Sequence, residues 1–145
     1  MGAVVFEACR KTVFGLRTAE APLQPIFLQQ PRLMYLDLRA SPDGARLALT
    51  IQDSSNSERR NVHILTFATG QLRQFTYDGW SSQPVWSPDG KRVVYKVTNP
   101  AAKPVIRYYA RAWDESDSAT AVPGADGAEA LEFPGPTGKY MAYLR

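Results

Sequence analysis

The residue types that most often perform catalysis or bind metals are scarce in this chain. His63 is the only histidine and Cys9 is the only cysteine among 145 residues. A catalytic triad built on His63 would need a positioned nucleophile, and the sequence has no Gly-x-Ser-x-Gly elbow. A structural zinc ion needs three or four Cys or His ligands, more than the chain has. We therefore expect a structural or surface role for His63, a small core residue in Cys9, no catalytic residue and no metal site.

Three acidic residues, Asp114, Glu115 and Asp117, share one predicted turn. A calcium-binding loop places its oxygen ligands at fixed alternate positions around a glycine, and this turn has neither that spacing nor the glycine. The chain also has no glycine-rich phosphate loop. We therefore interpret the acidic residues as a solvated turn and expect no cofactor.

The charge and hydropathy patterns argue against several classes of partner. Lys and Arg total 17 and Asp and Glu total 14, and the longest basic runs are pairs such as Arg59-Arg60. A nucleic-acid binder concentrates its basic residues on one face or run, so we expect no nucleic-acid partner. No apolar run approaches the length of a membrane-spanning helix, so we expect no membrane insertion. The short apolar N-terminal stretch contains Glu7 and precedes its positive charges, so no signal peptide is expected in this chain and the compartment stays open.

The clearest pattern in the sequence is a repeated turn. Its copies are Ser41-Pro42-Asp43-Gly44, Ser87-Pro88-Asp89-Gly90 and a weaker Gly135-Pro136-Thr137-Gly138, which keeps only Pro136 and Gly138. The first two copies are 46 residues apart, and the second and third are 48 apart. Proline presets φ, the serine and aspartate side chains bond nearby backbone N–H groups, and glycine tolerates a left-handed conformation. Each copy is therefore predicted to be a structural hairpin turn between two strands.

Apolar residues alternate on both sides of these turns, as they do in half-buried strands. Strands are expected before the turns at residues 34–40, 83–86 and 130–133, and after them at 46–51, 92–97 and 140–144. A second hairpin is expected at 61–67 with 72–77, and another at 104–112 with 120–122. Each complete unit of about 46 residues thus has four short strands.

Four strands in such a unit match one blade of a β-propeller. We predict an all-β fold, a partial β-propeller of about three four-stranded antiparallel blades at residues 31–79, 80–127 and an incomplete 128–145. Residues 1–30 match weakly, and 12–18 and 25–29 are expected to be the last two strands of a preceding blade. A β-sandwich also has many short strands, but the nearly fixed spacing of the turn favours the propeller. An arc of three blades leaves sheet edges exposed, so the chain is expected to be a fragment, a truncated gene product or an arc completed by a homo-oligomer.

The middle unit resembles a known repeat. Pro84-Val85-Trp86-Ser87-Pro88-Asp89-Gly90-Lys91 resembles the TolB-like, WD-type β-propeller repeat, which typically reads Pro-x-Trp-Ser-Pro-Asp-Gly-Lys and continues into a strand. Residues 69–79 resemble the outer-strand signature of the family, with Phe75 in place of the usual leucine. The first unit departs more, with Arg39 and Ala40 where a large aromatic residue is expected, and the third departs most.

The resemblance implies a function in binding rather than in chemistry. Such repeats form TolB, the non-catalytic propellers of prolyl-oligopeptidase-type peptidases and the propellers attached to bacterial serine/threonine kinases, and they bind partners, gate access or sense. We therefore expect a protein-interaction or scaffold module with a protein or peptide partner. A propeller fragment of such a peptidase, or the sensor part of such a kinase, is the alternative. Trp86 is expected in the blade core, whereas Trp80, in the loop at residues 78–82, is the candidate binding residue because loops carry function on such scaffolds.

Overall fold

The computed structural model describes residues 4–6, 13–17, 24–27, 33–53, 55–56, 58–133 and 141–144. These residues form strands, turns and loops and contain no helix, so the all-β prediction is confirmed. It follows that no helix in this part of the chain is long and apolar enough to cross a membrane. Cys9 lies outside the described residues, as do Pro136 and Gly138 of the weaker turn.

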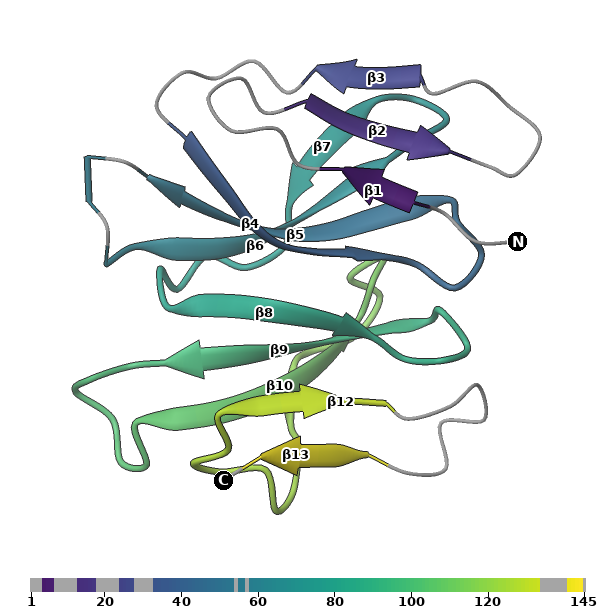
Figure 1. The fold of residues 1–145 in the computed structure, drawn as a ribbon. Helices are drawn as coiled ribbons and strands as arrows, with labels where there is room; N and C mark the ends of the chain where they lie inside the picture. Colours follow the sequence, from purple (N-terminus) through teal and green to yellow (C-terminus); the bar gives the residue numbers. More distant parts are fainter. Residues whose placement is uncertain are drawn as a thin grey trace.

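The described strands belong to four antiparallel sheets (Figure 1). The first sheet contains β1 (Val4–Phe6), β2 (Val13–Arg17) and β3 (Gln24–Phe27). The second contains β4 (Leu33–Ala40), β5 (Arg46–Asp53), β6 (Arg60–Thr66) and β7 (Gln71–Gln74). The third contains β8 (Ser81–Trp86), β9 (Arg92–Thr98), β10 (Ile106–Ala112) and β11 (Thr120–Ala121), and the last contains β12 (Ala130–Glu132) and β13 (Ala142–Leu144). Each strand pairs with its neighbours in sequence, so the first two expected units each form one four-stranded sheet.

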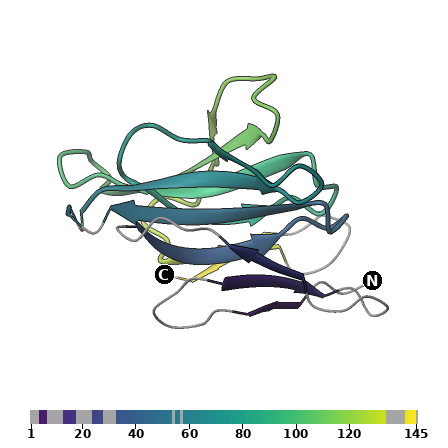
Figure 2. The same cartoon turned by 90° about the horizontal axis from the view of Figure 1, so that it is seen from above.

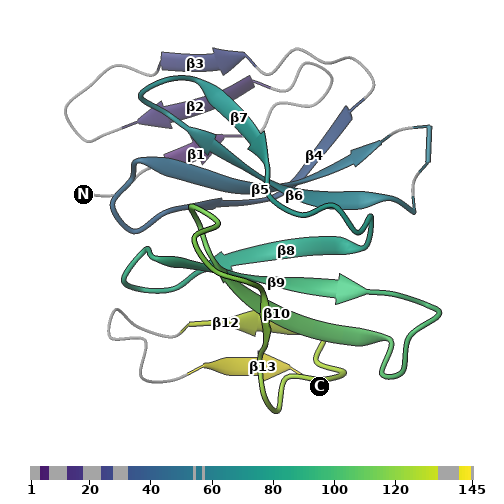
Figure 3. The ribbon, with the colours of Figure 1, turned by 180° about the vertical axis from the view of Figure 1, so that it is seen from behind.

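The sheets are stacked face to face in chain order. In Figure 1 the β1–β3 sheet lies above the β4–β7 sheet, the β8–β11 sheet lies below it, and β12 and β13 follow at the bottom. The view from behind in Figure 3 shows the same order of layers, whereas Figure 2 looks along the direction in which they follow one another. The β4–β7 sheet therefore lies between the β1–β3 and β8–β11 sheets in this order, and the described residues form no closed barrel.

Strand β5 shows how the sequence produces an inner layer. Its residues from Leu47 to Gln52 are all buried, and the side chains on its two faces belong to two different apolar clusters. Leu47 and Leu49 belong to a cluster of residues from the second sheet on one face, while Ala48, on the other face, belongs to the cluster shared with the β8–β11 sheet. A strand covered on both faces has apolar residues at successive positions, in contrast to the alternation of a half-buried strand.

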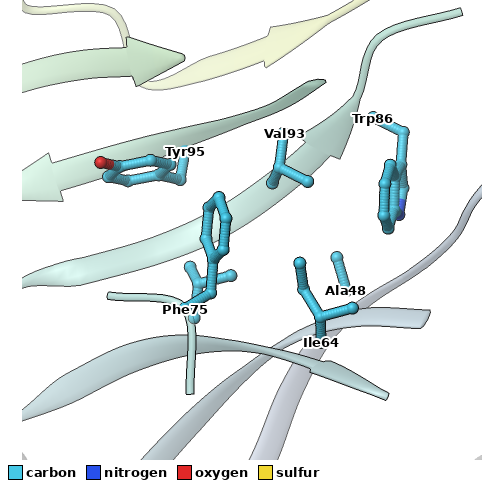
Figure 4. Close-up of a cluster of buried hydrophobic side chains, with 7 residues drawn as sticks. Ala48, Ile64, Phe75, Trp86, Val93 and Tyr95 are labelled. Atoms are coloured by element: carbon cyan, nitrogen blue, oxygen red, sulfur yellow. The ribbon is translucent and has the colours of Figure 1, made fainter. Parts of the chain in front are cut away.

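The core between the two complete sheets combines residues from both. Ile64 and Phe75 from the second sheet and its following loop meet Trp86, Val93 and Tyr95 from the third (Figure 4). The rings of Phe75 and Tyr95 are 5.9 Å apart and nearly perpendicular, a favourable geometry for aromatic pairs. Burial raises the pKa of Tyr95 to about 12. The expected core position of Trp86 agrees with this cluster, where the side chain is 6% exposed.

Several expected strand boundaries differ by one to three residues, and two of the differences have a clear local reason. The strand expected at 72–77 ends at Gln74, because Phe75 turns inward to the core and its N–H donates to the carbonyl of Val62. The Thr76 hydroxyl then accepts a hydrogen bond from the N–H of Val62 at 2.9 Å, so a side chain replaces the strand ladder. The loop expected at 78–82 ends at Trp80, because β8 already begins at Ser81.

The first strand of each complete sheet carries a β-bulge at the same repeat position. The pairing of β4 with β5 and that of β8 with β9 each shift register once. The bulged residues, Asp37 and Gln83, have φ values of 51° and 49° and are 46 residues apart. The Gln83 N–H donates to Asp37 Oδ2 and to Thr50 Oγ1, both at 3.2 Å. The bulge therefore turns a backbone donor away from its own ladder and bonds it to the preceding sheet.

Candidate binding site

The turn that joins β4 to β5 is closed by side-chain hydrogen bonds. The Ser41 hydroxyl donates to Asp43 Oδ1 and accepts a bond from the N–H of Arg46 at 3.0 Å. Asp43 Oδ1 also accepts the N–H of Ala45, and Gly44 has a φ of +68°. These contacts, with the bond from Ser41 contributing most, lower the pKa of Asp43. Glycine is required here because an L side chain is strained at this φ.

The turn that joins β8 to β9 has the same construction. The Ser87 hydroxyl donates to Asp89 Oδ1 at 2.6 Å, Asp89 accepts the N–H of Lys91, and Gly90 again has a φ of +68°. The bond from Ser87 is also the main cause that lowers the pKa of Asp89. Both turns end beside the same feature of the molecule, an open cleft.

The cleft has a volume of about 310 Å³ and lies at the turn end of three strands, β4, β8 and β12. Its lining residues come from these strands and the two turns: Arg39, Ala40, Pro42, Val85, Trp86, Pro88, Glu132 and Phe133. Most of them are apolar, and the two prolines and Trp86 present flat, rigid surfaces.

The cleft is built from equivalent positions of successive repeats. Val85, Trp86 and Pro88 each follow their counterparts in the first unit by 46 residues, and Glu132 and Phe133 follow Val85 and Trp86 by 47. Equivalent strand ends and equivalent turns of neighbouring sheets therefore lie side by side at the cleft. A site of this kind arises from stacking and does not exist in any single repeat.

The rim of the cleft carries two opposite charges. Arg39 and Glu132 form an ion pair with Nη2 and Oε1 3.4 Å apart, and their side chains are 49% and 61% exposed. Such an exposed pair contributes little to stability, so both groups remain available to bind charged or polar groups of a partner.

The floor of the cleft is rigid. Trp86 is buried against the core, and its indole Nε1–H donates to the backbone carbonyl of Arg39 at 2.9 Å. This bond joins the third sheet to the second directly beneath the rim. The cleft is thus preorganised, which reduces the entropy lost when a ligand binds.

The residues singled out in the sequence are dispersed. Trp80 is half-buried, forms a parallel bridge with Arg60 and does not line the cleft. His63 lies within β6, its Nδ1 is 3.2 Å from the carbonyl of Asn61, and burial lowers its pKa. Within the described ranges no three His, Cys, Asp or Glu residues are placed to hold a metal ion.

The acidic turn has a structural role that the sequence did not reveal. Asp114 is exposed, as expected of a solvated turn, but Glu115 pairs with Arg73 and Arg111, and Asp117 pairs with Arg92 at 2.6 Å. Because Arg73 belongs to β7, the turn after β10 reaches back to the second sheet.

A cation–π contact reinforces this link. Trp113 directly precedes the acidic turn, and the guanidinium of Arg46 from β5 lies 3.6 Å from its ring centroid. Arg73 Nη2 also donates to the carbonyl of Trp113 at 2.6 Å. We call the contacts of Arg46 and Arg73 with Trp113 and Glu115 the outer clamp, since they join the second and third sheets and none of these four residues lines the cleft.

No protein-family model matches the chain, and no curated protein matches it. The resemblance to TolB-like repeats is therefore carried by the quoted residues alone.

The cleft residues Arg39 and Glu132 were missed as a site. A signal was present, because both replace an apolar residue at the strand position occupied by Val85 in the middle unit. Two opposite charges at one repeat position, next to a turn that repeats, are a pattern worth testing in other repeat sequences.

Proposed function

We propose that this chain is a non-catalytic binding module, a partial β-propeller of TolB-like repeats that holds a peptide segment of a protein partner. The observation that carries the proposal is the cleft at the ends of β4, β8 and β12, which successive sheets build from equivalent residues. Binding sites on repeat proteins are commonly made in this way, by the same position of several units.

The propeller part of the proposal is supported by the period of the structure. The turn and the bulge both recur after 46 residues, and each complete unit is a four-stranded antiparallel sheet stacked on its neighbour. These features are those of consecutive blades.

The ligand part is supported by the chemistry of the cleft. Trp86, Phe133 and the two turn prolines offer an apolar surface for a side chain of a peptide. The rim pair of Arg39 and Glu132 offers a donor group and an acceptor group for the flanking backbone or charged residues. A peptide carries both apolar side chains and polar backbone groups, which favours a polypeptide ligand.

Selection from a random peptide library displayed on phage tests the proposal. We expect clones that bind the wild-type chain and bind Arg39→Glu about tenfold more weakly, because a rim charge next to an apolar anchor is inverted. Arg107→Glu is the matched control, since Arg107 carries the same charge on β10 and does not line the cleft. The absence of selectable clones, or clones that bind all three proteins equally, would refute the cleft as the site.

A further inference from the structure

The two rim charges of the cleft stand at the same position of different repeats. Arg39 on β4, Val85 on β8 and Glu132 on β12 are successively 46 and 47 residues apart, and all three line the cleft. Strands β4, β8 and β12 belong to three successive layers of the stack (Figure 1). The cleft therefore receives a positive group from one side of Val85 and a negative group from the other side.

The ion pair that these two charges form is open to competition. Its atoms Nη2 and Oε1 are 3.4 Å apart, which is long for a charge-assisted hydrogen bond. Among the ion pairs of the described residues, no other arginine and no other carboxylate is as exposed as Arg39 and Glu132. A long, exposed pair contributes little to stability, so a ligand can replace it at small cost.

Both charged groups can form more hydrogen bonds than the one they share. A guanidinium has five N–H donors, and the printed contacts of Arg39 use Nη1, which donates to the carbonyl of Leu38 at 3.1 Å, and Nη2. In the described part of the chain the Glu132 carboxylate accepts one bond, that from Arg39. Glu115 shows that a carboxylate in this protein can pair with two arginines at once. A ligand can therefore place a carboxylate on Arg39 and a cation on Glu132.

We propose that the peptide held by this cleft carries an acidic and a basic residue on opposite sides of an apolar anchor, the acidic residue at Arg39 and the basic residue at Glu132. This inference rests on the proposed function and specifies its ligand. Binding then exchanges one pair within the chain for two pairs with the ligand, so each charge keeps a partner when the cleft is covered. A ligand with a single charge would engage one rim group and leave the other covered and unpaired.

The fold fixes the order in which the ligand must present its charges. The Trp86 Nε1–H donates to the carbonyl of Arg39 at 2.9 Å, so the backbone that carries the positive group is attached to the floor of the cleft. Glu132 projects from a different sheet, on the other side of β8. The two charges cannot exchange places, and a peptide with the reverse order meets a like charge at both ends.

Parallel phage selections on the wild-type chain and on the double variant Arg39→Glu, Glu132→Arg test the proposal. The double variant keeps the rim pair and the net charge but reverses the direction of the pair. We expect clones selected on the wild type to share one order of acidic, apolar and basic residues, and clones selected on the double variant to share the opposite order. Circular dichroism establishes that the variants are folded.

The matched control makes the same exchange of charges outside the cleft. Arg107→Glu, Asp126→Arg reverses one positive and one negative residue that do not line it. Clones selected on this control are expected to keep the wild-type order.

A second measurement needs only the wild-type chain. A synthetic peptide with the sequence of a selected clone, and the same peptide with its acidic and basic residues exchanged, are titrated by calorimetry. We expect the exchanged peptide to bind about tenfold more weakly or worse. Clones without a charge pattern, one order from both proteins, or equal binding of the two peptides would overturn the charge order and leave the peptide cleft standing. A library that yields no clones would overturn both.

Discussion

Asp43 and Asp89 show what a single repeated residue contributes to this fold. Each accepts a hydrogen bond from the serine two residues before it and from the backbone N–H two residues after it. These bonds favour the charged form, so the pKa of each carboxyl lies below its ordinary value. The aspartates recur because the turn recurs, and no catalytic role is needed to explain them.

This geometry predicts an acid-sensitive stability. A carboxyl whose pKa is lowered on folding contributes stability that is complete above its unfolded pKa, about 3.9. That contribution is lost as the pH falls through the lower folded pKa. As the pH is lowered from 5 to below this unfolded pKa, we expect the free energy of unfolding to fall less in the double variant Asp43→Asn, Asp89→Asn than in the wild type. Urea unfolding at a series of pH values measures the difference.

The same variant provides its own control at neutral pH. The asparagine carbonyl still accepts the bonds from serine and backbone but carries no charge, so the variant is expected to be less stable than the wild type at neutral pH by about the amount that the wild type loses on acidification. Parallel pH profiles for the two proteins would contradict the assignment of the acid sensitivity to these turns.

At the scale of elements, the indole of Trp86 joins two sheets by one hydrogen bond. Trp86→Phe keeps the apolar surface of the core but removes the donor to the carbonyl of Arg39. We expect a loss of about 1–3 kcal/mol in the free energy of unfolding, from the missing bond and the space left by the smaller ring. Urea unfolding measures it, and Trp80→Phe, at a half-buried tryptophan outside the cleft, is expected to cost less.

The outer clamp predicts a measurable coupling between sheets. In a double-mutant cycle of Arg73→Ala and Glu115→Ala we expect a coupling of about 1 kcal/mol, decreasing in high salt, because both side chains are partly shielded from solvent. The exposed pair of Arg39 and Glu132 is the control and is expected to couple by only a few tenths of a kcal/mol, about the value for surface pairs. Equal coupling in both cycles would contradict the role of the clamp.

At the scale of the whole molecule, shared cores bind neighbouring sheets into one folding unit. The cluster around Phe75 contains residues of the second and third sheets, so neither sheet can bury its face alone. Phe75 itself is 1% exposed. Its replacement therefore affects both sheets at once.

We expect Phe75→Ala to lower the free energy of unfolding by about 3–5 kcal/mol. The unfolding transitions followed by tryptophan fluorescence and by circular dichroism should coincide in the wild type, because the sheets unfold together. Two separate transitions in the wild type would show that the sheets are independent units.

Much of the fold could be predicted from local patterns. The turn at Ser41–Gly44 needs only residues within six positions of one another, and the apolar residues that follow it identify strand β5. The chain order of strands followed from the same signals. The prediction failed where the position of a residue depends on contacts with residues distant in the sequence. Phe75 is the example, because it leaves the strand and packs in the core.

The sequence by itself determined the hairpins, their 46-residue period and the all-β class, since turn chemistry and alternation act between near neighbours in the chain. Only the tertiary structure decided that Arg39 meets Glu132, 93 residues away, and that Glu115 meets Arg73. Such contacts depend on how twisted sheets stack and which strand ends are brought into line, and no local pattern encodes that. The cleft and the outer clamp are therefore products of stacking, built from residues whose roles appear only when successive sheets meet.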